Sequence, residues 1–230
     1  MNWDQVVRKV TPHIVKIETP SGHGTGFLAI YNHDKTWVGI ATAAHVVSYA
    51  DDWQQPIKIQ YRNSKTVFLK ASERVIFIDW KTDSAVVFFL KGDLELPEFP
   101  ITLLPVGTPL GIGVEVGWLG YPGIEQFTLC FFSGSVSARQ EFRNAYLIDG
   151  VAINGVSGGP VVFATETDGV QIIGTVSAYK ANRANGDALP GLLIAQDVSH
   201  FHSVADNIRS IDDANSKKKE LEALQSEQQT

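Results

Sequence analysis

The chain has 230 residues, 44% of them hydrophobic, which is enough to bury the core of one compact unit or of two small barrels. Its formal net charge is -6 and no basic stripe is present, so nucleic acid is excluded as an expected partner. No apolar stretch approaches the roughly 18 residues of a membrane span, and the first residues lack the pattern of a signal peptide, so no membrane partner is expected either.

The chain opens with an expected amphipathic helix and continues as a series of short strands. Asn2 is a suitable N-cap for a helix over residues 2–10, which carries on one face Trp3, Val6, Val7 and Val10. Apolar, β-branched or aromatic runs bounded by Gly, Pro, Asn or Asp then predict strands at 14–18, 26–31, 37–42, 57–61, 67–77, 85–90, 115–119, 127–138, 146–148, 160–164, 171–177 and 192–195. Only residues 43–48 and 198–209 look helical within this region. The pattern predicts an all-β protein.

A proline-rich stretch over residues 94–109 divides the strands into two halves, as expected of a crossover between two barrels. We therefore expect one unit over residues 1–96, a second over 97–211 that ends in a closing helix, and a charged segment over 212–230. In that last segment Leu221 and Leu224 do not continue a heptad pattern. It is interpreted as a frayed helix, a disordered tail or a linker to a further domain.

The sequence NGVSGGP over residues 154–160 is the strongest candidate for chemistry. Glycines on both sides of Ser157 allow a tight turn, and they let a substrate carbonyl approach main-chain N–H groups. Acyl transfer requires that arrangement, in which a nucleophilic oxygen lies beside two donors for the developing oxyanion. The alternative interpretation is a Gly/Ser turn that only connects two strands.

Two further residues complete a possible catalytic triad with Ser157. His45 follows an apolar strand and has small neighbours, which would leave its imidazole exposed in a cleft, where it can act as a general base. Asp83 directly precedes the apolar strand at 85–90, and beside His45 it would fix the tautomer of the imidazole. The competing aspartate is Asp79. The chain order His, Asp, Ser is one that is known for this triad on a double β-barrel.

These segments resemble the trypsin/chymotrypsin superfamily, most closely its cysteine-poor HtrA/DegP-type branch. The resemblance runs from about residue 10 to residue 207, and it also rests on GTGF at 24–27, GYPG at 120–123, SGSVS at 133–137 and GTVS at 174–177. It implies two six-stranded antiparallel β-barrels with a C-terminal helix, with His45 and Asp83 in the first barrel and Ser157 in the second. The implied activity is that of a serine endopeptidase with the triad His45, Asp83 and Ser157, which needs no metal and no organic cofactor.

The resemblance also implies where a substrate binds. The backbone N–H groups of Gly155 and Ser157 would form the oxyanion hole, and Ser177 would help to orient Asp83. Residues 177–179 would line an extended substrate, which adds a strand to this edge. Val151 would lie at the base of the primary pocket and Tyr179 on its wall. Small or medium apolar P1 residues are therefore expected, and Arg or Lys is not, because Val151 offers no charge.

Two departures from the family limit what the resemblance implies. Val156 stands where digestive enzymes carry an aspartate that pairs with a freed N-terminus, so activation by N-terminal cleavage is not expected. Cys130 is the only cysteine, so the disulfide beside the catalytic histidine is absent, which favours a reducing, cytoplasmic location. The expected partner is a protein or peptide substrate. The alternative is a catalytically silent or partner-activated binding module that works with a regulatory protein in a larger assembly.

Overall fold

The strands of the N-terminal half join into one seven-stranded antiparallel sheet. The structure is a computed structural model that describes residues 2–61, 65–125, 127–151, 153–184 and 187–227. The strand order in this sheet is β5-β4-β1-β2-β3-β7-β6. Its members are β1 (Ile14–Thr19), β2 (Gly22–Tyr31), β3 (Trp37–Ala43), β4 (Ile57–Tyr61), β5 (Lys65–Leu69), β6 (Arg74–Asp79) and β7 (Ser84–Leu90).

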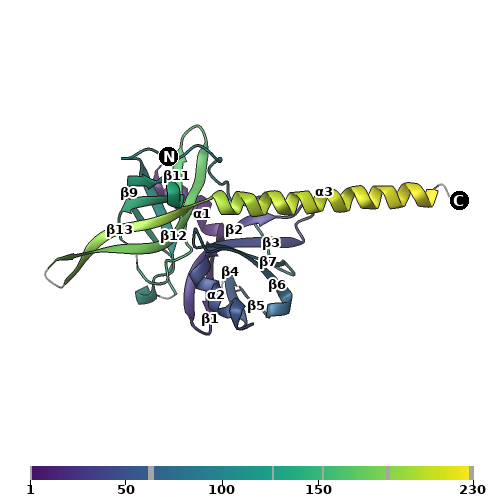
Figure 1. Cartoon of the computed structure of the whole chain (residues 1–230), viewed down its shortest axis with the longest axis horizontal. Coiled ribbons are helices and arrows are strands. Elements are labelled where there is room, and N and C mark those ends of the chain that lie inside the picture. The colour runs from purple at the N-terminus through teal and green to yellow at the C-terminus, as the bar shows by residue number, and fades with distance from the viewer. Residues whose placement is uncertain (1, 62–64, 126, 152, 185–186, 228–230) are drawn as a thin grey trace.

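The strands of the C-terminal half close into a six-stranded barrel with the order β10-β13-β12-β11-β8-β9. Its members are β8 (Glu115–Gly120), β9 (Cys130–Gln140), β10 (Ala145–Asp149), β11 (Pro160–Thr165), β12 (Gly169–Ala184) and β13 (Asp187–Asp197). Together with one long C-terminal helix, the two units confirm the predicted all-β, chymotrypsin-like fold (Figure 1).

The N-terminal half has one strand more than the six that the sequence predicted. The single strand expected at 67–77 is two strands, β5 and β6, which a 3-10 turn at Ala71–Glu73 separates. Glu73 Oε2 accepts a hydrogen bond from the Lys70 N–H at 2.8 Å, so a side chain takes the place of a strand partner there. Among the described residues no ladder joins β5 to β6, and the sheet stays open between these two edges.

Alternating apolar residues build two hydrophobic clusters. In β4, for example, Ile57, Ile59 and Tyr61 are buried, while the residues between them are partly exposed. One cluster lies within the N-terminal sheet. The other fills the C-terminal barrel and continues to the opposite face of the N-terminal sheet, where Phe27 and Phe88 belong to it. The junction between the halves is therefore packed as a continuous core, which holds them in one arrangement.

Three α-helices accompany the strands in the described residues: α1 (Trp3–Val10), α2 (Ala44–Asp52) and α3 (Ser199–Glu227). The predicted cap of α1 is confirmed, because Asn2 Oδ1 accepts a hydrogen bond from the Gln5 N–H at 3.0 Å. Each terminal helix packs on the half at the other end of the chain. The Trp3 ring of α1 lies 5.2 Å from that of Phe131 in the C-terminal barrel. In turn, α3 packs on the N-terminal sheet.

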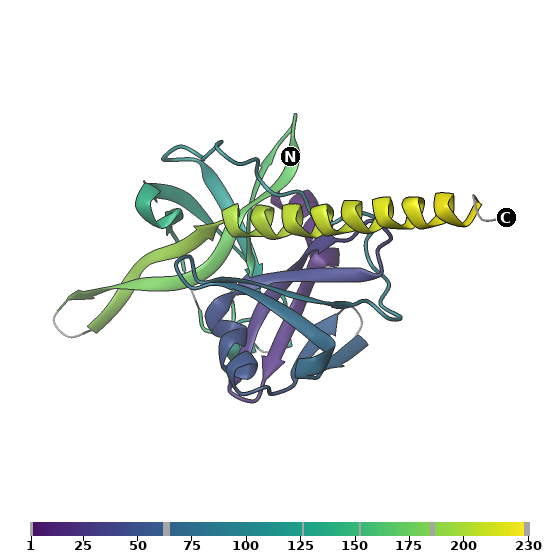
Figure 2. The ribbon, with the colours of Figure 1, turned by 45° about the vertical axis from the view of Figure 1, so that its right-hand side comes forward.

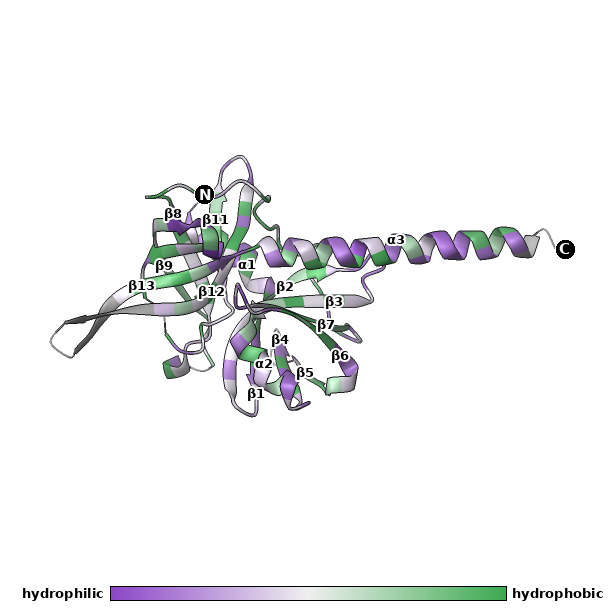
Figure 3. Ribbon diagram, in the orientation of Figure 1, coloured by the Kyte–Doolittle hydropathy of each residue, from purple (hydrophilic) through white to green (hydrophobic). Residues whose placement is uncertain are grey.

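The C-terminal helix extends well beyond the predicted residues 198–209. It continues to Glu227, and its second half projects from the body of the molecule (Figures 1 and 2). Good helix formers and an i,i+4 ion pair, Lys218 Nζ to Glu222 Oε1 at 3.9 Å, favour this continuation. Figure 3 shows that the projecting part is mainly hydrophilic. None of the helices in the described ranges combines the length and the apolarity that a membrane crossing requires.

Replacing Phe201 with alanine is expected to lower the free energy of unfolding by about 3–5 kcal/mol. The side chain is fully buried, and its ring lies 5.9 Å from that of Phe27 in β2. Leu221→Ala on the same helix is the matched control, because Leu221 is 60% exposed and its loss should change the free energy by less than about 0.5 kcal/mol. Urea unfolding followed by circular dichroism measures both, and equal effects would contradict a docking role of Phe201.

Candidate active site

His45 lies where β3 passes into α2. Ala43 and Ala44 before it are fully buried, and the Ala44 N–H donates to the Asp83 carbonyl oxygen at 2.9 Å. These small residues let the helix begin close to the backbone of Asp83. The His45 side chain remains 48% exposed, so its ring is accessible from solvent, as the sequence predicted.

The Asp83 carboxylate holds His45 at two points. Its Oδ2 lies 2.8 Å from Nδ1 of His45, and its Oδ1 accepts a hydrogen bond from the His45 backbone N–H at 3.0 Å. The Ser177 hydroxyl donates a third hydrogen bond to Oδ2 at 2.6 Å. Asp83 has a φ of 46°, in the left-handed region that aspartate adopts more readily than most residues. In this conformation its carboxylate reaches both His45 and Ser177.

Two opposing effects set the pKa of Asp83. Burial raises it, whereas the hydrogen bonds from His45 and Ser177 lower it, and the pKa comes out below the usual value of an aspartate. The carboxylate is therefore charged at neutral pH. A charged carboxylate accepts a hydrogen bond from His45 when Nδ1 carries the proton of the ring. In that tautomer Nε2 is the nitrogen that can accept a proton.

The alternative aspartate does not reach the histidine. Asp79 accepts hydrogen bonds from the Lys81 N–H at 2.9 Å and from the Thr82 hydroxyl at 2.8 Å. Its carboxylate therefore closes the tight turn between β6 and β7. Of the two aspartates that the sequence offered, the structure brings only Asp83 to His45.

The turn that carries Ser157 depends on two glycines with positive φ. Gly155 has a φ of 92° and Gly158 a φ of 81°, conformations that strain a residue with a side chain. Gly158 also has no room for one, because a Cβ there would overlap the Thr42 hydroxyl and the Thr25 carbonyl oxygen. The glycine thus lets the turn approach β2 and β3, and β3 is the strand that leads to His45.

Thr25 fastens this turn to β2. Its N–H donates to the Ser157 carbonyl oxygen at 2.8 Å, and its hydroxyl donates to the Gly155 carbonyl oxygen at 2.9 Å. The same hydroxyl accepts a hydrogen bond from the Tyr121 N–H at 3.0 Å. The sequence motifs do not predict this role of Thr25. The one available signal is a threonine within β2, next to apolar residues. Thr25 is fully buried, and a buried hydroxyl needs hydrogen-bond partners.

The two backbone donors predicted for an oxyanion hole are both available. The turn is closed by its own backbone, since the Val156 N–H donates to the Ile153 carbonyl at 3.1 Å and the Gly159 N–H to that of Val156 at 2.9 Å. Neither the Gly155 N–H nor the Ser157 N–H makes a hydrogen bond to a described residue. Both can therefore donate to an anionic oxygen.

Ser157 and the His45–Asp83 pair come from different halves and meet at their junction. Gly24 touches both segments: a Cβ there would lie 2.7 Å from the Val46 side chain and 3.1 Å from the Ser157 carbonyl oxygen. The Ser157 hydroxyl makes no hydrogen bond within the described ranges, so none joins it to His45, whose Nδ1 faces Asp83. Catalytic hydrogen bonds often shorten only when a substrate binds.

The predicted pocket residues differ in position. Ser177 is 8% exposed and contacts the candidate triad through its hydrogen bond to Asp83. Val151 is 52% exposed and Tyr179 39% exposed, so both present apolar or aromatic surface to solvent.

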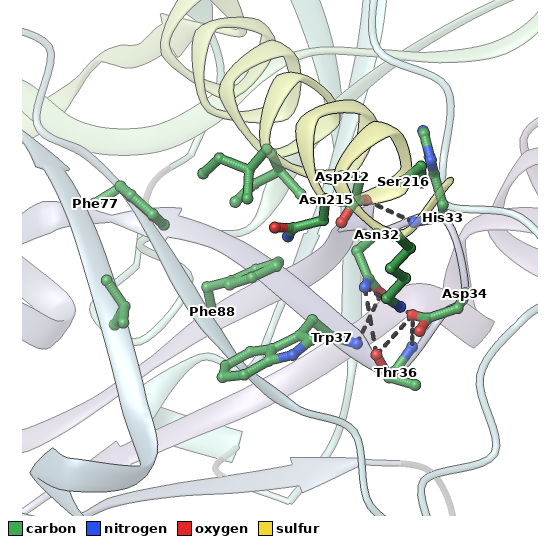
Figure 4. A pocket seen from close by; sticks show the side chains of 14 residues that line it. Asn32, His33, Asp34, Thr36, Trp37, Phe77, Phe88, Asp212, Asn215 and Ser216 are labelled. Carbon is green, nitrogen blue, oxygen red and sulfur yellow. Dashed lines mark hydrogen bonds between the residues drawn. The ribbon is translucent and has the colours of Figure 1, made fainter. Parts of the chain in front are cut away.

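A cavity of about 530 Å³ lies away from these residues, between α3 and the outer face of the N-terminal sheet (Figure 4). Trp37, Phe77 and Phe88 line it from the sheet, and Asp212 lines it from α3. No residue of the candidate triad belongs to its lining. Within the described part of the chain, no group of His, Cys, Asp or Glu side chains is suited to hold a metal ion.

Comparison with known proteins agrees with the fold and with the motifs. Residues 24–170, more than half of the chain, match the family model of the trypsin-like peptidase domain. A serine-to-alanine mutant of Rv3671c from M. tuberculosis H37Rv, in an inactive form, is similar in structure: identity is 21%, the TM-score is 0.60, and the match covers 88% of this chain and 89% of that chain. The Rv3671c protease in an inactive form is 20% identical, with a TM-score of 0.62, and the match covers 88% of this chain and 92% of that chain. No curated protein matches. The HtrA/DegP-type subdivision stays a prediction.

Ser177→Ala is expected to raise the pKa of Asp83, because it removes a hydrogen bond to the charged carboxylate. A carboxyl group with a lowered folded pKa stabilises the fold above its unfolded pKa of about 3.9, and this contribution is lost as the pH falls through the folded value. The variant should therefore lose about 1.5–3 kcal/mol of unfolding free energy at pH 7 and progressively less in acid. Urea unfolding at pH 7 and at acidic pH measures this. Exposed Ser133→Ala is the control, and a Ser177→Ala loss that does not depend on pH would contradict the role of the charge.

Proposed function

Because this chain belongs to the family of trypsin-like peptidase domains, we propose that it is a serine endopeptidase that hydrolyses peptide bonds through an acyl-enzyme. The observation that carries the proposal is the Asp83 carboxylate 2.8 Å from Nδ1 of His45. Gly24 lies between Val46, the neighbour of His45, and the glycine-flanked Ser157, whose backbone N–H has no partner among the described residues. We assign Ser157 as the nucleophile, His45 as the general base and acid, and Asp83 as the residue that orients His45.

In the proposed first step, Ser157 Oγ attacks the scissile carbonyl carbon while its proton passes to Nε2 of His45. The N–H groups of Gly155 and Ser157 stabilise the negative charge that develops on the carbonyl oxygen. Collapse of this intermediate breaks the C–N bond, transfers the proton from His45 to the leaving amine and leaves an acyl-enzyme. His45 then takes a proton from water, whose oxygen attacks the ester carbonyl carbon. The bond from this carbon to Ser157 Oγ breaks, His45 returns the proton to Oγ, and the carboxylic acid and free Ser157 result. Asp83 stays charged throughout.

A partner-activated enzyme is the second candidate, and the unbonded Ser157 hydroxyl favours it. In that case a regulatory protein would bring Ser157 into hydrogen-bonding contact with His45. A catalytically silent binding module receives less support, because all three triad residue types are present and the two oxyanion donors are unoccupied. A fluorophosphonate probe, which reacts with an activated serine, separates the three. Labelling of the isolated chain indicates an active enzyme, labelling only with an added partner indicates activation, and no labelling in either case indicates a silent module.

The proposed substrate is a protein or peptide, and neither nucleic acid nor a membrane enters the proposal. We propose a cytoplasmic enzyme, because a chain with one cysteine needs no oxidising compartment to fold. Two further features support a small or medium apolar P1 residue. Val151 places no charge near the primary pocket, and the aromatic Tyr179 would narrow its mouth.

Peptide-library profiling should show cleavage after Ala, Val or Leu, with modest discrimination among them. One methylene in an apolar pocket contributes only about 1–3 kcal/mol, so preferences of roughly tenfold to two-hundredfold are expected. A clear preference for Arg or Lys would contradict the assignment of Val151. A preference for Phe or Trp would show that Tyr179 points away from the pocket.

Ser157→Ala should abolish fluorophosphonate labelling and lower kcat by about 10⁶, with the fold intact, because the nucleophilic oxygen is gone. In the same assay Asp83→Asn should cost about 10⁴, since the imidazole would take the wrong tautomer. The matched control is Asp79→Asn, which changes a nearby aspartate that does not contact His45. Cleavage by the Ser157 variant at the wild-type rate would exclude Ser157 as the nucleophile.

A further inference from the structure

The cavity between α3 and the N-terminal sheet lies where the helix leaves the sheet (Figure 4). Ile208 is 6% exposed, so α3 still packs on the core at this residue. Three residues later Ile211 is 55% exposed, and both residues line the cavity. A volume of about 530 Å³ is typical of sites that enclose a small organic molecule. The cavity is therefore large enough for a ligand with one or two rings.

Aromatic rings form the floor of this cavity. The Phe88 and Trp37 rings are stacked, with centroids 5.4 Å apart and 14° between their planes. The Phe77 ring meets that of Phe88 at 64°, with the centroids 6.3 Å apart. Figure 4 shows these three residues opposite Asp212 and Asn215, which line the cavity from α3. The faces of aromatic rings carry partial negative charge, so this floor attracts cations and stacks with other rings.

A carboxylate that is fixed in place, that of Asp34, lines the cavity from the turn between β2 and β3. Its Oδ1 accepts hydrogen bonds from the Asn32 amide at 2.7 Å, from the Thr36 hydroxyl at 2.6 Å and from the Thr36 N–H at 3.1 Å. The hydrogen bonds from Thr36 hold the pKa of Asp34 below its usual value, so the group is charged at neutral pH. Its other oxygen accepts no hydrogen bond from a described residue.

A second fixed carboxylate, that of Asp212, lines the cavity from α3. Its Oδ2 accepts a hydrogen bond from the His33 N–H at 2.8 Å, and its Oδ1 has no donor among the described residues. The His33 ring faces another acid, with Nε2 3.8 Å from Asp213 Oδ1. Lys219 also lines the cavity, but no described residue holds its ammonium group, which can turn to water on its flexible stem. The charges that are held in place around the cavity are therefore negative.

We propose that this cavity binds a small organic cation, an alkylammonium group attached to an aromatic body. The body lies against the ring of Phe88, and the ammonium group meets the unbonded oxygen of Asp212. Such a ligand uses both features of the lining, whereas an aromatic anion would face two fixed carboxylates and an inorganic cation would leave the rings unused. No residue of the candidate triad lines the cavity, so the inference goes beyond the proposed function and does not depend on it.

Tryptamine, indole and indole-3-acetate share one ring system and differ in charge, so their binding to the whole chain tests the proposal. Titration followed by protein NMR should give tryptamine a Kd on the order of 1 mM, as expected for a ligand of this size. Indole should bind about tenfold more weakly because it lacks the charge, and indole-3-acetate more weakly still. The indole N–H signal of Trp37, assigned with Trp37→Phe, should move during the titration because Trp37 lines the cavity.

Variants of α3 separate the effect of charge from that of folding. Asp212→Asn keeps an acceptor for the His33 N–H but removes the charge, so it should weaken tryptamine binding about tenfold and leave indole binding unchanged. Lys219→Ala removes the opposing charge and should tighten tryptamine binding about two- to fivefold. The matched control is Asp206→Asn, because Asp206 pairs with Arg209 on the same helix outside the cavity. Circular dichroism and fluorophosphonate labelling of each variant should equal those of the wild type.

Three results would overturn the inference: indole-3-acetate that binds as tightly as tryptamine, shifts that leave the Trp37 signal unmoved, and an equal loss of affinity in Asp212→Asn and Asp206→Asn. Indole that binds as tightly as tryptamine would assign the cavity to uncharged rings and overturn the choice of a cation. None of these results bears on Ser157. A chain that binds tryptamine as expected but does not react with the fluorophosphonate supports the inference and contradicts only the proposed function.

Discussion

The Asp83 carboxylate accepts hydrogen bonds from both halves of the molecule, from His45 beside the N-terminal sheet and from Ser177 in the C-terminal barrel. A largely buried charge destabilises a fold unless hydrogen-bond donors satisfy its oxygens. Three donors satisfy the Asp83 oxygens: the backbone N–H and the ring Nδ1 of His45, and the hydroxyl of Ser177. They reach one carboxylate only in the observed orientation of the two halves. The charged state of Asp83 and the relative position of the halves therefore depend on each other.

Other contacts at the junction support the same orientation. Thr25 ties the turn of Ser157 to β2, α1 packs on the C-terminal barrel through Trp3, and α3 packs on the N-terminal sheet through Phe201. Because the proposed base and nucleophile belong to different halves, a displacement of about 1 Å at the junction would be enough to impair their reaction. A continuous hydrophobic core across the junction limits such a displacement in a way that a flexible connection would not.

The features that follow from local chemistry could be predicted from the sequence. The cap at Asn2, the glycines around Ser157 and the position of Asp83 at the start of a strand depend on residues that are neighbours in the chain. The separation of β5 from β6 could not be predicted in the same way. Apolar residues occur on both sides of the break at Ala71–Glu73, where the Glu73 carboxylate accepts a hydrogen bond from the Lys70 N–H and the Glu73 N–H donates to the Lys70 carbonyl. The role of Thr25 also escapes a local pattern, because its partners, Gly155 and Ser157, are about 130 residues away.

The outer part of β12 and β13, over residues 176–195, shows why a strand can escape a pattern search. Alternating hydrophobicity appears in a strand because one of its faces is buried, and residues 180–188 carry no such alternation. The Asn-Gly pair at 185–186, which lies outside the described residues, is the one local hairpin signal there. The strand conformation of these residues follows from their pairing with β13.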